Sequence, residues 1–185
     1  MDGTLTMAMH DFDAIRSALG LPQGQPILEA IAERPKAEAA RLHQELDDLE
    51  IKLAYKAQMQ PGADTLLELL KSRGCSLGIL TRNGRQIADI TLEAAGIHQF
   101  FEPDHIVSRD CCAAKPLPEG VHLLMQRWHC DADNTVMTGD YLYDLKAGFD
   151  AGTATVHLDV NGEFPWPEMT TAGVKSLQAL IELIS

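Results

Sequence analysis

Four short segments of the chain combine acidic, basic or hydroxyl side chains with glycine or proline, and each could contribute to a phosphate or metal site. The first is Met1–Thr6, in which Asp2 precedes Gly3. A carboxylate on a tight glycine turn, with free backbone N–H groups beside it, suits a phosphate group and a Mg2+ ion. Because D-G-T is also a common turn, this segment indicates a site only together with the others.

The second segment, Thr81-Arg82-Asn83-Gly84, follows a short apolar run, Cys75–Leu80, that is typical of a buried strand. The hydroxyl group of Thr81 would then lie at the end of that strand. The helix that begins after Asn83 would direct its positive N-terminus at an anion. The alternative is that Asn83 only caps this helix.

The third segment is Ala114-Lys115-Pro116-Leu117-Pro118, which places a lysine between an expected strand and an expected helix. Proline has a nearly fixed backbone angle, so the two prolines would hold the backbone of Lys115 in place at the edge of a sheet. An ordinary solvent-exposed lysine in a loop is the alternative.

The fourth segment, Gly139-Asp140-Tyr141-Leu142-Tyr143-Asp144, follows an apolar run and contains two carboxylates four residues apart. On a helix this spacing puts both acids on one face. Such a pair usually caps a helix, and it binds a metal where further oxygen ligands meet it. The segment therefore predicts a metal site only if the fold brings the other segments to it.

The elements that must position these segments alternate from residue 75 onward. We expect strands at 75–80, 105–107, 135–138 and 153–158, with helices at 84–95, 118–128, 141–149 and 174–184 between and after them. This order predicts an α/β fold, with a parallel sheet, helices on both faces, and ligands bound beyond the carboxyl ends of the strands.

The first third of the chain differs, because residues 7–59 contain no convincing strand and 36–59 has apolar residues at helical spacing. We expect a helical cap over 7–60, with hinges near 6–9 and 60–62, and an α/β core made of 1–6 and 61–185. The acidic cluster over 45–50 is expected to be a solvated helix face. Five basic cap residues are candidates to meet an anionic substrate: His10, Arg16, Arg34, Lys36 and Arg41.

In this order the four segments resemble the haloacid dehalogenase superfamily, and most closely its phosphatases with a small helical cap, the phosphoglycolate phosphatase and β-phosphoglucomutase-like group. The motifs of that family are D-x-D-G-T-[LV], a strand ending in Ser or Thr, a Lys often followed by Pro, and G-D-x-x-x-D. Here they read M-D-G-T-L-T, G-I-L-T-R-N, A-A-K-P-L-P and T-G-D-Y-L-Y-D. The resemblance extends over nearly the whole chain and implies a Rossmann-like core with an inserted cap.

The resemblance also implies a two-step phosphoryl transfer through an aspartyl-phosphate, with Mg2+ as cofactor. Asp2 would act as general acid and base while its carbonyl group binds the metal. Asp140 would be the direct carboxylate ligand of Mg2+, and Asp144 a second or water-mediated one. The phosphoryl group would be held by Thr81 and Lys115, by backbone N–H groups near Gly3 and Asn83, and by Asn83 and Arg82 beside it.

The first motif departs from the family pattern, because Met1 occupies the middle position of D-x-D. The nucleophilic aspartate of the family, and the apolar strand before it, would therefore precede Met1. We expect either that Met1 is an internal residue of a longer product, through a misassigned start or a truncation, or that this is a genuine inactive form. The chain as given is expected to be inactive.

The charge and composition of the chain limit the classes of partner that it is expected to bind. With 15 Lys and Arg against 27 Asp and Glu, the net charge of −12 predicts neither nucleic acid nor a membrane surface as a partner. Four cysteines without a C-x-x-C pair favour a reducing, cytoplasmic location. The short cap favours a small phosphorylated metabolite as substrate, and the chain is expected to be a monomer or a homodimer.

Two other functions stay open from the sequence. A noncatalytic protein that binds a phosphorylated ligand could keep Asp2, Thr81, Lys115 and Asp140 as its anion and metal site. A dehalogenase or a phosphomutase could use the same scaffold. A dehalogenase would not need Asp140 and Asp144, so their presence disfavours it.

Overall fold

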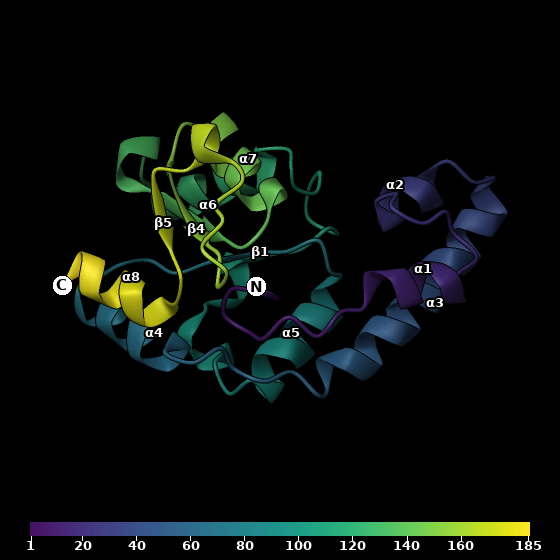
Figure 1. Ribbon diagram of the computed structural model, residues 1–185, viewed down its shortest axis with the longest axis horizontal. Helices are drawn as coiled ribbons and strands as arrows, with labels where there is room; N and C mark the ends of the chain where they lie inside the picture. The colour runs from purple at the N-terminus through teal and green to yellow at the C-terminus, as the bar shows by residue number, and fades with distance from the viewer.

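The computed structural model describes residues 1–185, in which helices and short parallel strands alternate (Figure 1). Before the first strand come the helices α1 (Phe12–Ala18), α2 (Ile27–Ala32), α3 (Lys36–Ala54) and α4 (Ala63–Ser72). The rest of the chain contains β1 (Ile79–Leu80), α5 (Arg85–Ala94), β2 (Ile106–Val107), α6 (Glu119–Trp128), β3 (Val136–Gly139), α7 (Leu142–Asp150), β4 (Ala154–Leu158), β5 (Ala172–Val174) and α8 (Leu177–Ile184).

The strands form two parallel sheets, with the orders β1-β2 and β3-β4-β5. Ile79 lies opposite Ile106 in the first sheet, and Val136 lies opposite Ala154 in the second. The α/β class with parallel strands is thereby confirmed, although the expected single sheet is divided in two. β1 is shorter than the expected strand because the chain is exposed at Cys75 and first becomes buried at Leu77. β5 has only three residues, one of them glycine, so it gave no recognisable pattern.

Helices cover both faces of the sheets because neighbouring strand residues point to opposite sides. Ile79 and Ile106 pack in one buried cluster with residues of α4 and α5. Leu80 and Val107, the next residues of the same strands, pack in another cluster with residues of α6 and α7. α4 and α8 pack together with β4 and β5 in a third cluster. This layering directs the carboxyl ends of β1, β2 and β3 toward one region.

The amino-terminal residues lie between the two sheets (Figure 1). Met1 is buried against Ile79 and Ile106 of the first sheet. Three residues later, the Thr4 hydroxyl donates a hydrogen bond of 2.8 Å to Asp140, which directly follows β3 of the second sheet. Neither β1 nor β3 has a partner strand on its remaining edge, and Val136 at the start of β3 is 59% exposed.

Helices α1, α2 and α3 lie to one side of the sheets and share a buried cluster that includes Ile15, Ile31 and Leu42. Two irregular segments join them to the rest of the chain, and these segments run side by side. The Met7 N–H donates to the Gln58 carbonyl group, and the Gln60 N–H donates to the Leu5 carbonyl group, at 2.9 Å each. α3 also contacts α5. The division into a core and a cap over 7–60 stays a prediction.

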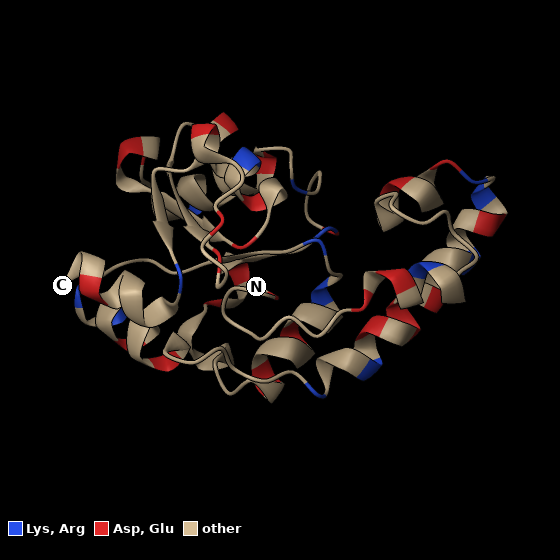
Figure 2. Ribbon diagram, in the orientation of Figure 1, with Lys and Arg blue, Asp and Glu red and all other residues tan.

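Acidic residues are spread over the helices on both sides of the molecule, with fewer basic residues among them (Figure 2). None of the helices combines the length and the apolar composition that crossing a bilayer would require.

Because α1–α3 share a buried cluster of their own, a substitution in that cluster tests whether residues 7–60 form an independent cap. Leu42→Ala removes a side chain that is 1% exposed and should destabilise its surroundings by about 2–5 kcal/mol. If residues 7–60 move as a unit, amide hydrogen exchange will accelerate in α1, α2 and α3 while α6 and α7 keep their protection. Lys52→Ala on the exposed side of α3 is the control. Equal acceleration throughout the chain would contradict an independent cap.

Candidate active site

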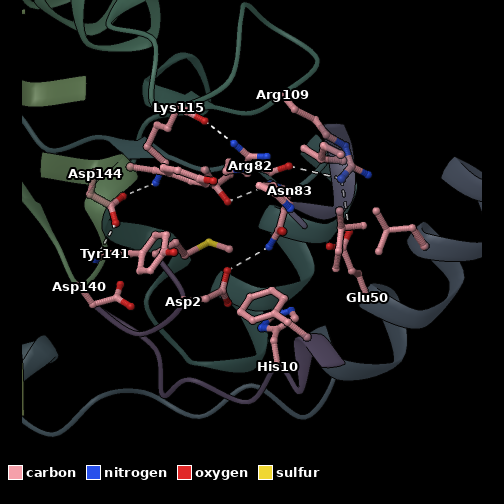
Figure 3. Close-up of a pocket in the computed structure, with 18 of the residues that line it drawn as sticks. Asp2, His10, Glu50, Arg82, Asn83, Arg109, Lys115, Asp140, Tyr141 and Asp144 are labelled. Atoms are coloured by element: carbon pink, nitrogen blue, oxygen red, sulfur yellow. Dashed lines mark hydrogen bonds and ion pairs between the residues drawn. The ribbon is translucent and has the colours of Figure 1, made fainter. Parts of the chain in front are cut away.

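A cavity of about 420 Å³ lies between the helices α1–α3 and the carboxyl ends of the strands (Figure 3). Seven of the eight residues expected to form a site line it: Asp2, Thr81, Arg82, Asn83, Lys115, Asp140 and Asp144. Gly3 is the exception: it does not line the cavity but lies against the carboxyl group of Asp140. The fold thus brings the four sequence segments together, while the chemical roles of these residues stay predictions.

Asp2 is held by two donors that come from different parts of the chain. The Asn83 side-chain amide donates to one carboxylate oxygen at 3.0 Å, and the Thr6 hydroxyl contacts the other at 3.3 Å. Asn83 therefore does not cap α5 with its side chain. The N-cap of that helix is Gly84, and the Arg85 N–H at its start donates to Asp110 at 2.7 Å. The Arg85 N–H at the start of α5 is therefore bonded to Asp110 and does not point into the cavity as a free donor for an anion.

Lys115 and Asp144 form an ion pair in the cavity wall, and each side chain is 8% exposed. The second oxygen of Asp144 accepts a hydrogen bond from the Tyr141 N–H at 3.2 Å, which caps α7. Burial is the largest single effect on Asp144 and by itself would raise its pKa. The charge and hydrogen bond of Lys115, the amino group of the chain and the hydrogen bond from the Tyr141 N–H together outweigh burial and hold this pKa below its ordinary value. Asp144 is therefore ionised and fixed in place.

Asp140 lies beside this pair without a cationic side chain of its own. Burial, and then the negative charge of Asp144, raise the pKa of Asp140 above its ordinary value. The Thr4 hydroxyl is its hydrogen-bond donor. Gly3 has a φ of +74°, and a β-carbon at this position would overlap the Asp140 carboxyl group. The glycine of the first segment is thus required both by its backbone angle and by the close approach of Asp140.

The donor set suits Mg2+ more than a metal that needs a complete protein cage. Asp140 and Asp144 place two carboxylates side by side in a buried pocket, and their repulsion is what a divalent cation would relieve. No group of three His, Cys, Asp or Glu side chains converges in a way that could hold a metal ion. Mg2+ commonly keeps several waters and takes phosphate oxygens as ligands, so one or two carboxylates suffice.

Of the five basic cap residues expected to meet a substrate, His10 and Arg16 line the cavity. Arg34, Lys36 and Arg41 do not. Arg34, just before α3, and Arg41, within it, each pair instead with an acid four residues further along the chain. Tyr141 and Tyr143 also line the cavity, and sequence reasoning passed over them although they lie between the two acids of the fourth segment.

The expectation of a solvated acidic face on α3 is wrong at two of its positions. Arg109, which follows β2, forms ion pairs with Asp47 and with Glu50, the latter at 3.4 Å. The Arg109 N–H also donates to the Asn83 carbonyl group at 3.1 Å. Burial raises the pKa of Glu50 from 4.5 to about 7, against the opposing effect of Arg109. Sequence reasoning missed this contact because its partners are about sixty residues apart.

Residues 7–158 of the chain match the family model described as "Haloacid dehalogenase-like hydrolase". The chain belongs to the haloacid dehalogenase-like hydrolase family. It is 30% identical over 191 aligned residues to an uncharacterized hydrolase of Saccharomyces cerevisiae, with 100% of this chain and 88% of that protein covered.

Further relatives of this haloacid dehalogenase-like hydrolase agree in sequence and in fold. The probable phosphatase IndB of Dickeya dadantii is 32% identical to it over 157 residues, which cover 82% of this chain and 67% of that protein. The crystal structure of a hydrolase from Pseudomonas syringae superposes with a TM-score of 0.81 at 21% identity, over 99% of this chain and 94% of the other. That structure supports the fold alone.

The buried Glu50 generates a pH test of this hydrolase. A carboxyl group whose pKa is raised in the folded state stabilises the fold below its unfolded pKa, and this contribution is lost as the pH rises from 4.5 through 7. Glu50→Gln keeps the neutral form, so we expect it to be more stable than wild type above pH 7 and to lose that advantage toward pH 4.5. Urea denaturation at several pH values measures this. The exposed Asp48→Asn should not change the pH profile, and an unstable Glu50→Gln variant above pH 7 would contradict the prediction.

Proposed function

We propose that the protein is a Mg2+-dependent phosphomonoester hydrolase that acts through an aspartyl-phosphate. The observation that carries the proposal is that Asp2, Thr81, Lys115 and Asp140, from four separate loops, line one cavity. A phosphate and a divalent cation together need this combination of carboxylate, hydroxyl and ammonium groups. The phosphatase name of the IndB relative supports the same reaction class.

In this proposal the reaction has two steps. In the first, Lys115 and Thr81 hold the oxygens of the phosphoryl group while the nucleophilic carboxylate displaces the alcohol from phosphorus, and protonated Asp2 donates the proton that the leaving oxygen takes up. In the second, ionised Asp2 removes a proton from the water that splits the acyl phosphate, which releases phosphate and restores the nucleophile as a carboxylate and Asp2 as a carboxylic acid. Mg2+ held by Asp140 would neutralise charge on the phosphoryl oxygens. Asn83 and Thr6 orient Asp2 through their hydrogen bonds.

We further propose that the active form has the nucleophilic aspartate directly before Met1, at the end of an additional strand. Two features support this. The facing edges of β1 and β3 have no partner strand, and Met1 enters the space between the two sheets. A parallel strand there would pair with both edges and end beside Asp2 and Lys115.

The remaining expectations become part of the proposal. The substrate is a small phosphorylated metabolite, and the protein acts as a monomer or a homodimer. Its four cysteines are free, and Cys75 and Cys111 are exposed, which supports a reducing compartment such as the cytoplasm.

Comparing this 185-residue chain with one that carries the additional strand and aspartate tests the proposal. The given chain should hydrolyse p-nitrophenyl phosphate negligibly, since it lacks the carboxylate that forms the covalent intermediate. The extended chain should be active with Mg2+ and lose activity when the metal is chelated. Equal turnover by both would place the nucleophile elsewhere. A folded but inert extended chain would favour a noncatalytic phosphate-binding protein.

Three substitutions in the extended chain should separate the roles. Asp140→Asn should raise the Mg2+ concentration needed for activity, because the metal loses its carboxylate ligand. Asp2→Asn and Lys115→Met should each lower kcat by roughly 10² or more, the usual effect of losing a general acid or a charge-stabilising group. Circular dichroism identifies variants that fail to fold. The exposed Lys146→Met, which breaks only a surface pair, should leave the kinetics unchanged.

A further inference from the structure

Every Lys and Arg side chain that lines the cavity already has a carboxylate partner in the chain. The pairs are Arg16 with Asp13, Arg82 with Glu29, Arg109 with Asp47 and Glu50, and Lys115 with Asp144. A ligand that carries a second anionic group beyond its phosphate therefore finds no unpaired Lys or Arg side chain, and the remaining basic side chain of the lining, His10, is stacked on Phe12.

Arg82 is the critical residue, because it lies next to the proposed phosphate site and both of its terminal nitrogens are already hydrogen-bonded within the chain. One of its terminal nitrogens donates to both oxygens of Glu29, at 2.8 and 2.7 Å. The other donates to the Lys115 carbonyl group, and the guanidinium carbon lies over the Tyr143 ring, 4.8 Å from its centre. A ligand carboxylate would have to compete with Glu29 or with the Lys115 carbonyl group, since each pair of N–H groups that a guanidinium offers to an anion includes at least one of these terminal nitrogens.

The outer wall of the cavity is apolar instead. α1 and α2 contribute Phe12, Ile27 and Leu28, and the core contributes Tyr141. Phe12 and Tyr141 are 54% and 51% exposed, so the cavity leaves aromatic surface uncovered. His10 stacks on Phe12 with 5.6 Å between ring centres. Aromatic surfaces of this kind gain most from contact with an apolar ring or the C–H face of a sugar.

We propose that the ligand of this site is a phosphomonoester of an uncharged, ring-bearing alcohol, and that Glu29 determines this specificity. By neutralising Arg82, Glu29 removes the cation that a second anionic group would need, and it repels that group. The inference rests on the proposed function for the identity of the reacting group. It disfavours small doubly anionic substrates such as phosphoglycolate and pyrophosphate.

A matched pair of ligands tests the inference by binding alone. Phenyl phosphate and 4-carboxyphenyl phosphate differ by one carboxylate, and calorimetry with Mg2+ on the 185-residue chain measures both without turnover. We expect wild type to prefer phenyl phosphate by about tenfold, and Glu29→Gln to abolish or reverse the preference, since a change of this size corresponds to about 1.4 kcal/mol. Glu45→Gln, which breaks the Arg41 pair on the solvent side of α3, is the matched control and should keep the wild-type ratio.

Equal or tighter binding of the carboxylated ligand to wild type would overturn the inference, as would an unchanged ratio in Glu29→Gln. The ratio of kcat/KM values for the two esters, measured in the extended chain, is a second test of the inference. It takes the place of calorimetry if the 185-residue chain or its variant does not fold. Failure of both ligands to bind to folded chains would overturn the site itself. Binding with the expected ratio but without hydrolysis by the folded extended chain would remove the proposed function and keep the ligand class.

Discussion

The site depends on the ion pair between Lys115 and Asp144, which joins the two sheets where no backbone pairing does. Lys115 follows β2 of the first sheet, and Asp144 lies on α7, which follows β3 of the second. Removing one partner of such a buried pair leaves an uncompensated charge and destabilises a protein by about 3–5 kcal/mol. Because Asp144 also caps α7 through the Tyr141 N–H, the same carboxylate fixes the helix that carries the fourth segment.

This ion pair also determines what the cavity can bind. Asp144 already neutralises Lys115, so Asp2 and Asp140 remain as acids without a basic side-chain partner around a space into which a phosphate would bring further negative charge. The raised pKa of Asp140 reflects burial first and the repulsion of Asp144 second. A divalent cation would offset both effects, which is why the proposed phosphate site and the proposed metal site require each other.

The sequence predicted the residues at strand ends well, because the carboxyl ends of parallel strands meet at one edge whatever the details of packing. Thr81, Lys115 and Asp140 follow from this rule. It could not predict how the sheet divides, since strand pairing depends on residues far apart in the chain. Nor could local pattern show that Asp47 and Glu50, in a run of acids typical of a solvated face, turn toward Arg109. Position on a helix gives the face of a side chain but not the partner opposite that face.

The ion pairs that link α2 and α3 to the rest of the chain, Glu29 with Arg82 and Glu50 with Arg109, differ in their surroundings. Glu50 is buried and lies four residues before the end of α3, close to the segment that joins the helix to α4. Its contact with Arg109 moves little if the cap rotates about that segment. Glu29 is exposed and lies on α2, beyond the other end of α3, which at 19 residues is about 28 Å long. Rotation would therefore separate Glu29 from Arg82 first, and a half-exposed pair of this kind contributes at most about 1 kcal/mol. If residues 7–60 move as a cap, the contact proposed to exclude a second anion is thus also the one that opening would break most easily, and selection of the ligand would take place as the cap closes.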